Sequence, residues 1–136
     1  MQFTKKASYG LIAALELARS DGDRPTSAAT IADRYKLPAP FVEKILHVLK
    51  TAGVVRSKQG RGGGYLLAAP ADAVSVRSVL GALDEEPDLV SCIADGSDCS
   101  LTDICPTRGA WHVIHRRFLG LLDSLTLQDL LDDQPR

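Results

Sequence analysis

The chain of 136 residues lacks cysteine everywhere except in one stretch of fourteen residues. Cys92, Cys99 and Cys105 lie in that stretch, and the other 122 positions contain none. Disulfides need pairs of thiols, so a disulfide framework leaves one of the three unexplained. The chain also has no apolar run of eighteen residues and no basic-then-apolar leader. We therefore expect neither a membrane span nor a secretory signal, and a cytoplasmic protein whose thiols stay reduced.

Three thiolates in one short segment suit a metal or iron–sulfur centre, because soft sulfur ligands bind zinc or iron. Residues 91–100 are small, polar and turn-forming, which favours a loop that folds around an ion. Structural zinc is an alternative, although it usually has two close pairs of ligands and the gaps here are six and five residues. Buried structural cysteines are another alternative, but such cysteines are expected on apolar periodic segments rather than in a polar loop.

The formal net charge of −1 conceals two halves of opposite sign. Up to Ala69 there are eleven Lys and Arg against five Asp and Glu, and from Pro70 onward there are five against twelve. A basic first half predicts contact with a polyanion and leaves another role to the acidic half. Ordinary solvated surface charge is the alternative. The length allows one real core with an appendage.

Hydrophobic periodicity predicts three helices in the first half, at about residues 6–20, 28–35 and 40–52. Thr26 and Ser27 are candidate caps of the second helix, and the prolines of residues 37–40 separate it from the third. The expected apolar residues are Tyr9, Leu11, Ile12, Leu15, Leu17 and Ala18 in the first helix and Phe41, Ile45, Val48 and Leu49 in the third. A tight turn between two such helices indicates a helix-turn-helix, with Gly53 as a left-handed end.

Strand-like runs at residues 54–58 and 65–68 flank a glycine-rich segment, residues 59–64. A basic glycine-rich hairpin after a helix-turn-helix indicates a wing, because glycine allows positive φ and a close approach to DNA. A nucleotide-binding loop is the alternative, but this segment lacks the Gly-Lys-Ser or Gly-Lys-Thr ending and does not open a helix.

After the wing, Ser75 can cap a short helix at residues 76–83, and a long helix is predicted from about residue 106 to 125. The long helix carries apolar residues at three- and four-residue steps, which predicts a dimer seam made of Trp111, Ile114, Phe118, Leu121 and Leu125. Packing of this helix on its own domain is the alternative. A two-fold dimer matches a palindromic operator in double-stranded DNA.

These motifs together resemble the Rrf family of winged-helix iron–sulfur transcription regulators. The resemblance covers nearly the whole chain and rests on residues 3–5 with Tyr9, residues 53–55 and 60–67, the three cysteines, Trp111 and residues 126–131. It implies a mainly α fold with a small β-wing. Residues 1–69 would be the winged helix-turn-helix domain, and residues 70–136 would contain a cluster-binding loop (about 91–106) and the dimerisation helix.

The resemblance implies a homodimeric DNA-binding regulator, such as a repressor, that senses iron, redox state or nitric oxide through an iron–sulfur cluster. Cys92, Cys99 and Cys105 would be the cluster ligands. Relatives with two-iron clusters have a histidine where this chain has Arg108, and relatives with four-iron clusters use an aspartate where it has Ser8. The fourth ligand is therefore open among Ser8, His112, Asp95, Asp98 and a small external molecule. Three cysteines without the histidine favour a four-iron (4Fe-4S) over a two-iron (2Fe-2S) cluster.

The start of the third helix is expected in the major groove, and the wing on phosphates or in the minor groove. The candidate contacts are Lys5, Lys6, Ser27, Pro40, Phe41, Glu43, Lys44, His47, Lys58, Gln59 and Arg61.

An enzyme is not expected, because no substrate-pocket motif accompanies a pairing of Cys105 with His112 or His115. An electron carrier has no need of a basic wing. Two alternatives stay open: a winged-helix regulator with a thiol-redox or zinc site, and a non-catalytic adaptor in iron–sulfur assembly.

Overall fold

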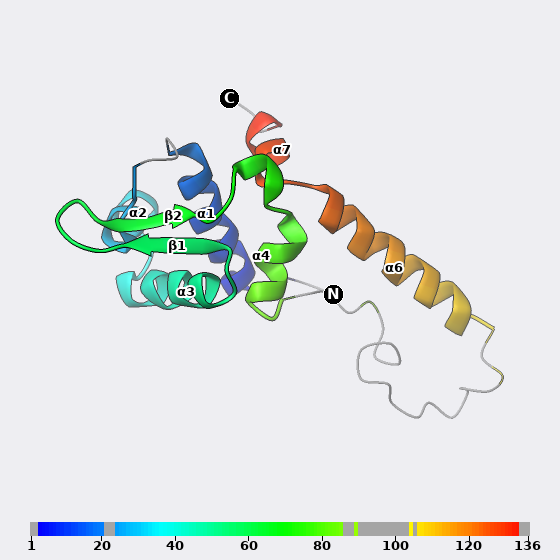
Figure 1. Ribbon diagram of the computed structural model, residues 1–136. Coiled ribbons are helices and arrows are strands. Elements are labelled where there is room, and N and C mark those ends of the chain that lie inside the picture. Colours follow the sequence, from blue (N-terminus) through cyan, green and yellow to red (C-terminus); the bar gives the residue numbers. More distant parts are fainter. Residues whose placement is uncertain (1–2, 21–23, 86–88, 90–103, 105, 134–136) are drawn as a thin grey trace.

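A computed structural model describes residues 3–20, 24–85, 89, 104 and 106–133 (Figure 1). Its elements in chain order are α1 (Lys5–Arg19), α2 (Ala28–Tyr35), α3 (Ala39–Thr51), β1 (Val55–Lys58), β2 (Gly64–Leu67), a short 3-10 turn η1 (Ala71–Ala73), α4 (Val76–Ala82), α6 (Arg108–Ser124) and α7 (Leu127–Asp132). The strands form one antiparallel hairpin. This order confirms the mainly α fold with a small β-wing.

Side-chain caps define where several helices begin. The Ser27 hydroxyl accepts a hydrogen bond from Thr30 N at 3.1 Å, and the Ser75 hydroxyl accepts one from Ser78 N at 3.0 Å. Both predicted caps are confirmed, since each satisfies an amide that the first turn leaves unpaired. Gly53 follows α3 with φ +83°, as the predicted left-handed end requires. The sequence did not predict α7, which begins with a reciprocal capping box between Thr126 and Asp129.

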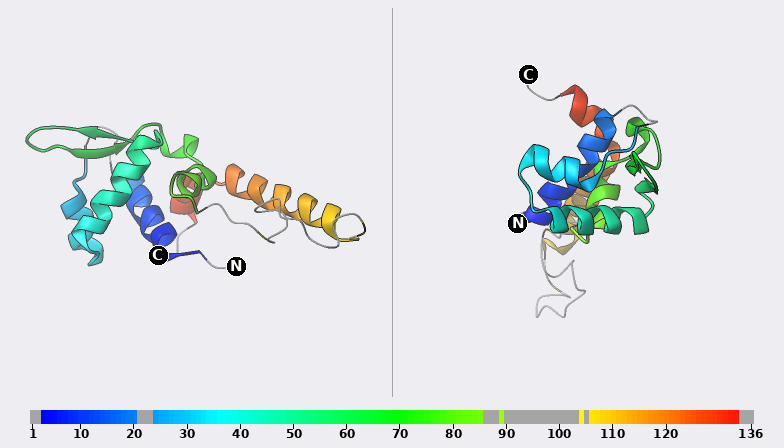
Figure 2. Two further views of the ribbon diagram at one scale, coloured as in Figure 1. Left: turned by 90° about the horizontal axis from the view of Figure 1, so that it is seen from below. Right: turned by 90° about the vertical axis from the view of Figure 1, so that its left-hand side faces the viewer.

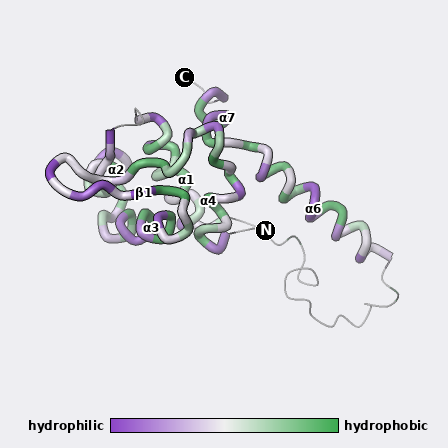
Figure 3. Tube along the Cα trace, in the orientation of Figure 1, coloured by the Kyte–Doolittle hydropathy of each residue, from purple (hydrophilic) through white to green (hydrophobic). Residues whose placement is uncertain are grey.

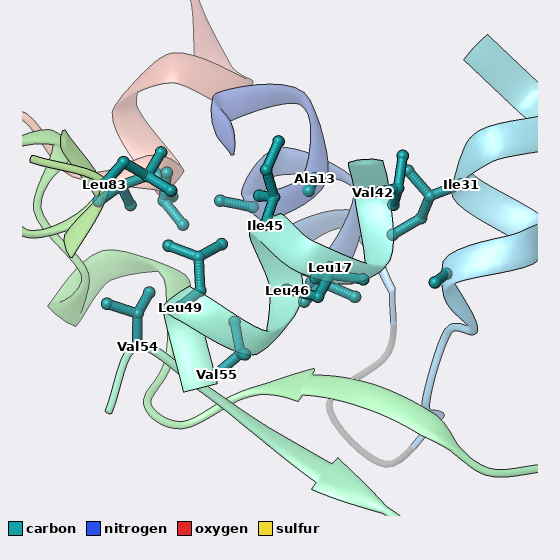
Figure 4. Close-up of a cluster of buried hydrophobic side chains, with 14 of the residues drawn as sticks. Ala13, Leu17, Ile31, Val42, Ile45, Leu46, Leu49, Val54, Val55 and Leu83 are labelled. Carbon is teal, nitrogen blue, oxygen red and sulfur yellow. The ribbon is translucent and has the colours of Figure 1, made fainter. Parts of the chain in front are cut away.

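The core lies where α1, α2 and α3 meet above the hairpin (Figure 4). The fully or nearly buried side chains include Ala13, Leu17, Ile31, Val42, Ile45, Leu46, Leu49, Val54, Val55 and Leu83. On α3 the prediction was right for Ile45 and Leu49 but missed Val42 and Leu46, and Phe41 and Val48 are only half-buried. Val42, Ile45, Leu46 and Leu49 lie on one face of α3 at steps of three, one and three residues, and this face packs α3 against α1.

The predicted apolar stripe of α1 packs on the core: Leu17 is buried, and Tyr9, Leu11, Leu15 and Ala18 pack against the buried cluster, which leaves out Ile12. Tyr9, Ile12 and Leu15 are half-buried, and the buried face consists of Ala7, Gly10, Ala13, Ala14 and Leu17, with Glu16. Small residues let other helices approach closely: a Cβ on Gly10 would lie 2.2 Å from Leu83 Cδ1. Other helices pack closely on α1 because its contact face consists of small residues. Side-chain hydrophobicity alone does not reveal this property.

The hairpin is attached to the helices by its second strand. Val55 pairs with Leu67 and Lys58 with Gly64. Thr26, just before α2, adds a backbone pair: Thr26 N donates to Tyr65 O at 3.0 Å and Tyr65 N to Thr26 O at 2.8 Å. Gly64 makes this approach possible, because a Cβ there would lie 2.5 Å from the Thr26 carbonyl carbon.

Helix α6 extends away from the rest of the described structure, at the end opposite the wing (Figure 2). Leu122 is its one buried residue, all residues of this helix being described. Leu122 joins a small second cluster with Ala7, Val76 and Leu80. Phe118 and Leu125, predicted for the dimer seam, pack against this cluster of their own chain. No described helix is both long and apolar enough to cross a membrane.

Candidate nucleic-acid interface

Helix α3 divides into a buried and an exposed face. Pro40, Glu43, Lys44 and His47, all predicted DNA contacts, are exposed, whereas the neighbouring apolar residues are buried. This division follows from the 3.6-residue period, which places Glu43, Lys44 and His47 within one turn of each other. The structure thus gathers four predicted contacts on one accessible helix with two potential donors to base edges, Lys44 and His47.

Phe41 differs from these neighbours because it is half-buried. Its ring meets Tyr9 of α1 edge to face, with centroids 5.4 Å apart and an angle of 86° between the rings. Lys6 and Lys44 flank the same spot, a small recess of about 120 Å³ that Phe41, Ile45 and Val48 also line. The packing between α1 and α3 accounts for Phe41 without a base contact.

The wing presents polar side chains at its tip. Lys58, Gln59 and Arg61 are exposed, and the hairpin end is hydrophilic along its trace (Figure 3). Gly60 and Gly62 have φ of +99° and +74°, and Gly63 N donates to Gly60 O at 3.0 Å. The predicted positive φ in the wing is confirmed, because this tight turn needs left-handed backbone at two positions; the close approach to DNA stays a prediction.

The first turns of α1 and α2 contain the remaining predicted contacts. Lys5 is exposed and Lys6 half-buried at the start of α1. Ser27 is half-buried, and besides capping α2 its hydroxyl shares a hydrogen bond of 2.8 Å with the Thr30 hydroxyl. Ser27 therefore has a structural role as the cap of α2, and its contact with DNA stays a prediction.

Sequence reasoning missed a polar network at the base of the helix-turn-helix. Glu16 of α1 is 5% exposed and accepts hydrogen bonds from the Arg34 guanidinium and the Tyr35 hydroxyl of α2. The available signal was its position, three residues after Ala13 and one before Leu17, on a face that is otherwise apolar. A charged residue on a buried helical face implies paired partners elsewhere.

The three cysteines, Cys92, Cys99 and Cys105, lie outside the described residues, as do the candidate ligands Asp95 and Asp98. The other two candidates, Ser8 on α1 and His112 on α6, are exposed. Within the described ranges, no three His, Cys, Asp or Glu side chains are grouped as a metal ion would require. The ligand set therefore stays a prediction from the sequence.

The chain enters the cysteine segment next to the start of α1. Asp84 has left-handed backbone with φ +55°, and Glu85 N donates to Leu80 O at 2.8 Å. The Glu85 carboxylate accepts a hydrogen bond of 2.5 Å from the hydroxyl of Thr4, the residue that also caps α1 through Ala7 N. The last continuous described residue before the cysteines is thus bonded to the N-terminal cap of α1.

An apolar groove of about 280 Å³ runs between α1, α4 and α6. It is lined by Phe3, Thr4, Ala7, Ser8, Leu11, Val76, Leu80 and Leu122. Elsewhere on α6, Ile114 and Leu121 are 47% and 53% exposed. One chain therefore presents both an apolar hollow and apolar side chains that it does not cover itself.

The chain is similar to known transcriptional regulators. The profile of the Rrf2 family, described as an iron-dependent transcriptional regulator, matches residues 3–133. The HTH-type transcriptional regulator IscR of Klebsiella pneumoniae is 33% identical over 134 residues, which cover 98% of this chain and 82% of that protein. The solved structure of T. potens IscR has a TM-score of 0.75 at 30% identity and covers 98% of this chain and 88% of its own.

A second solved structure is that of CymR, described as the global cysteine regulator of B. subtilis. It has a TM-score of 0.78 at 29% identity and covers 99% of both chains. The matched proteins are regulators rather than enzymes, in agreement with the prediction from the sequence.

Proposed function

This chain belongs to the Rrf2 family of transcriptional regulators, and on that premise we propose that it is a homodimeric DNA-binding regulator that senses iron, redox state or nitric oxide through an iron–sulfur cluster. The observation that carries the proposal is a basic winged helix-turn-helix whose α4 leads directly into a segment with three cysteines. The regulator acts in the cytoplasm, where reduced thiols are available.

Operator recognition begins with the exposed face of α3 in the major groove. Glu43 is suited to accept from a cytosine amino group, and Lys44 and His47 to donate to guanine or phosphate. Lys58, Gln59 and Arg61 of the wing, with Lys5 and Lys6, contribute mainly to backbone or minor-groove binding. This assignment is supported by the exposure of the side chains named on α3 and the wing and of Lys5 at the start of α1, where Lys6 is half-buried.

Dimerisation uses α6 of two chains and suits a palindromic operator. Trp111, Ile114 and Leu121 are the seam residues that the body of their own chain does not bury. The groove that Leu11 and Leu80 help to line accepts apolar side chains of the second copy, which removes two apolar surfaces from water at once.

Cys92, Cys99 and Cys105 would hold the cluster, since three soft thiolates fit an iron–sulfur centre and a four-iron form leaves one iron for a different ligand. Bound there, the cluster supplies iron that responds to oxidation, nitric oxide or iron supply. Candidates for the fourth position are Ser8, His112, Asp95 and Asp98. Within the chain, the hydrogen bond from Thr4 to Glu85 connects the start of the cysteine segment to the start of α1.

A thiol-based regulator is the second candidate, favoured by the likeness to CymR, which is described as a cysteine regulator. In that case the three cysteines respond by oxidation or bind zinc, and the DNA-binding part works unchanged. An adaptor in iron–sulfur assembly would not need a sequence-specific operator.

Anaerobic purification distinguishes these functions. We compare wild type, Cys99→Ala and the control Ser97→Ala by iron and sulfide content, absorption spectrum, native mass and binding to a duplex selected from a randomised library. A brown dimer with about four irons and four sulfides per chain, lost in Cys99→Ala and retained in Ser97→Ala, supports the proposal. A colourless or zinc-containing dimer that binds DNA selects the thiol or zinc regulator instead. Failure to select any duplex favours the adaptor.

A further inference from the structure

Glu16 is the buried charged side chain of the described structure, with 5% of its surface exposed. It lies on α1 between the core residues Ala14 and Leu17. Burial of a carboxylate in such surroundings is costly unless strong donors compensate for the lost water. Apolar residues would fill this position at lower free-energy cost, so packing alone does not explain the carboxylate.

The donors both come from the last turn of α2. Arg34 Nη1 donates to one carboxylate oxygen and the Tyr35 hydroxyl donates to the other. Arg19 adds an ion pair, with Nη1 4.0 Å from Glu16 Oε2, and donates to the Tyr35 hydroxyl at 3.4 Å. The hydrogen bond to Glu16, followed by burial, raises the pKa of Tyr35, as expected for a hydroxyl that donates to a carboxylate.

The other end of α2 is held by the wing. Ser20 at the end of α1 shares a hydrogen bond of 3.0 Å with the Thr26 hydroxyl, and Thr26 forms the backbone pair with Tyr65 of β2. Helix α2 thus has directional bonds at both ends, to β2 at its start and to Glu16 at its end. Apolar contacts such as that of Ile31 tolerate small rotations, whereas hydrogen bonds to a fixed carboxylate do not.

We infer that Glu16 is a positioning residue for DNA binding: it fixes the orientation of α2 relative to α1 and the wing, and so the alignment of α3 with the wing on an operator. The inference rests on the proposed function, because it requires sequence-specific binding. It predicts a change in operator affinity opposite in direction to the change expected from charge alone. Removal of an acid from the basic domain strengthens attraction to phosphates, so simple electrostatics predicts tighter binding, whereas loss of positioning predicts weaker specific binding.

The test uses the full-length dimer and a duplex that the wild type selects from a randomised library, with a scrambled duplex for non-specific binding. Glu16→Gln keeps the size of the side chain, and the matched control Asp33→Asn removes an exposed acid from α2. We expect Glu16→Gln to bind the selected duplex about tenfold more weakly, the loss typical of one charge-assisted hydrogen bond. Binding to the scrambled duplex and the salt dependence stay as in Asp33→Asn.

Glu16→Asp keeps the charge but withdraws the carboxylate from Arg34 and Tyr35 by one methylene group, so it should also bind the selected duplex more weakly if positioning is the cause. Tyr35→Phe removes only one of the donors to Glu16 and should also bind the selected duplex more weakly. This variant tests the inference if Glu16→Gln does not fold. The inference is overturned if Asp33→Asn and whichever of Glu16→Gln and Tyr35→Phe folds bind both duplexes with equal affinity. If the wild type selects no duplex, the proposed function is wrong and the inference falls with it, a result visible before any variant is compared.

Discussion

The body of the molecule and helix α6 differ in how completely the chain buries its own apolar residues. In the body, α3 alone has four buried apolar side chains in its thirteen residues, whereas α6 has one in seventeen. Val113, Ile114 and Leu121 of α6 are between 42% and 53% exposed. A helix gains most of its stability from packing one apolar face, and α6 leaves more of its apolar face uncovered than the body does. The proposed dimer would cover this face, so mutations in the body and in α6 should affect stability and assembly separately.

The largest expected effect is on the body. Leu46 is fully buried in α3, so Leu46→Ala should lower the free energy of unfolding by about 2–5 kcal/mol, because it removes apolar contacts and leaves a cavity. Urea unfolding at fixed protein concentration measures the change. The exposed Lys44→Ala should change it by less than about 0.5 kcal/mol. A loss at Leu46 no greater than that at Lys44 would contradict the burial of Leu46 in the core of the body.

The second prediction concerns α6. Leu121→Glu should raise the dimer dissociation constant by about 30- to 150-fold, which corresponds to about 2–3 kcal/mol, because a carboxylate would be buried without a partner. Unfolding of the body should stay close to wild type. Sedimentation equilibrium measures the assembly, and Asp123→Ala, on the opposite side of α6, is the control. An unchanged dimer would show that α6 is not the interface.

Within the body, the wing attachment is more sensitive to side-chain size than α4. Gly64→Ala brings a Cβ against the Thr26 backbone, and we expect a loss of about 1–3 kcal/mol in unfolding free energy. Gly81→Ala is the matched control, because nothing lies within 4 Å of its added Cβ in α4. That change should be neutral or stabilise by up to about 1 kcal/mol. Thermal unfolding of the two variants is compared, and equal midpoints would refute the steric argument.

The smallest effect is expected where the two regions join. Val76 N donates to Leu125 O at 2.8 Å, beside the Ser75 cap of α4. Ser75→Ala should cost about 1 kcal/mol of unfolding free energy, the usual value of a lost helix cap. Ser124→Ala, which removes an exposed hydroxyl, should cost less. If chemical unfolding shows no difference between the two, the cap does not stabilise this junction.

Much of the fold could be predicted because its signals are local. The bounds of α2 agree with the prediction, and Ser27 and Ser75 cap the helices as expected. Short-range features of this kind depend on the residues within one turn. Helix α7 was missed because its six residues are too few for a clear period. Glu16 was missed as a site because its partners, Arg34 and Tyr35, lie eighteen and nineteen residues away.

The sequence by itself determined the helix breaks, the caps, the glycine-rich wing and the grouping of three cysteines, since these depend on backbone preferences and on thiol chemistry. The tertiary structure decided which side chains meet. It made the small residues around Gly10 the contact face of α1, and it gave Glu16 its donors. It also divided the predicted seam of α6, with Phe118 packed on its own chain and Leu121 left exposed. Periodicity identifies an apolar face, but only the packing of distant segments determines what covers it.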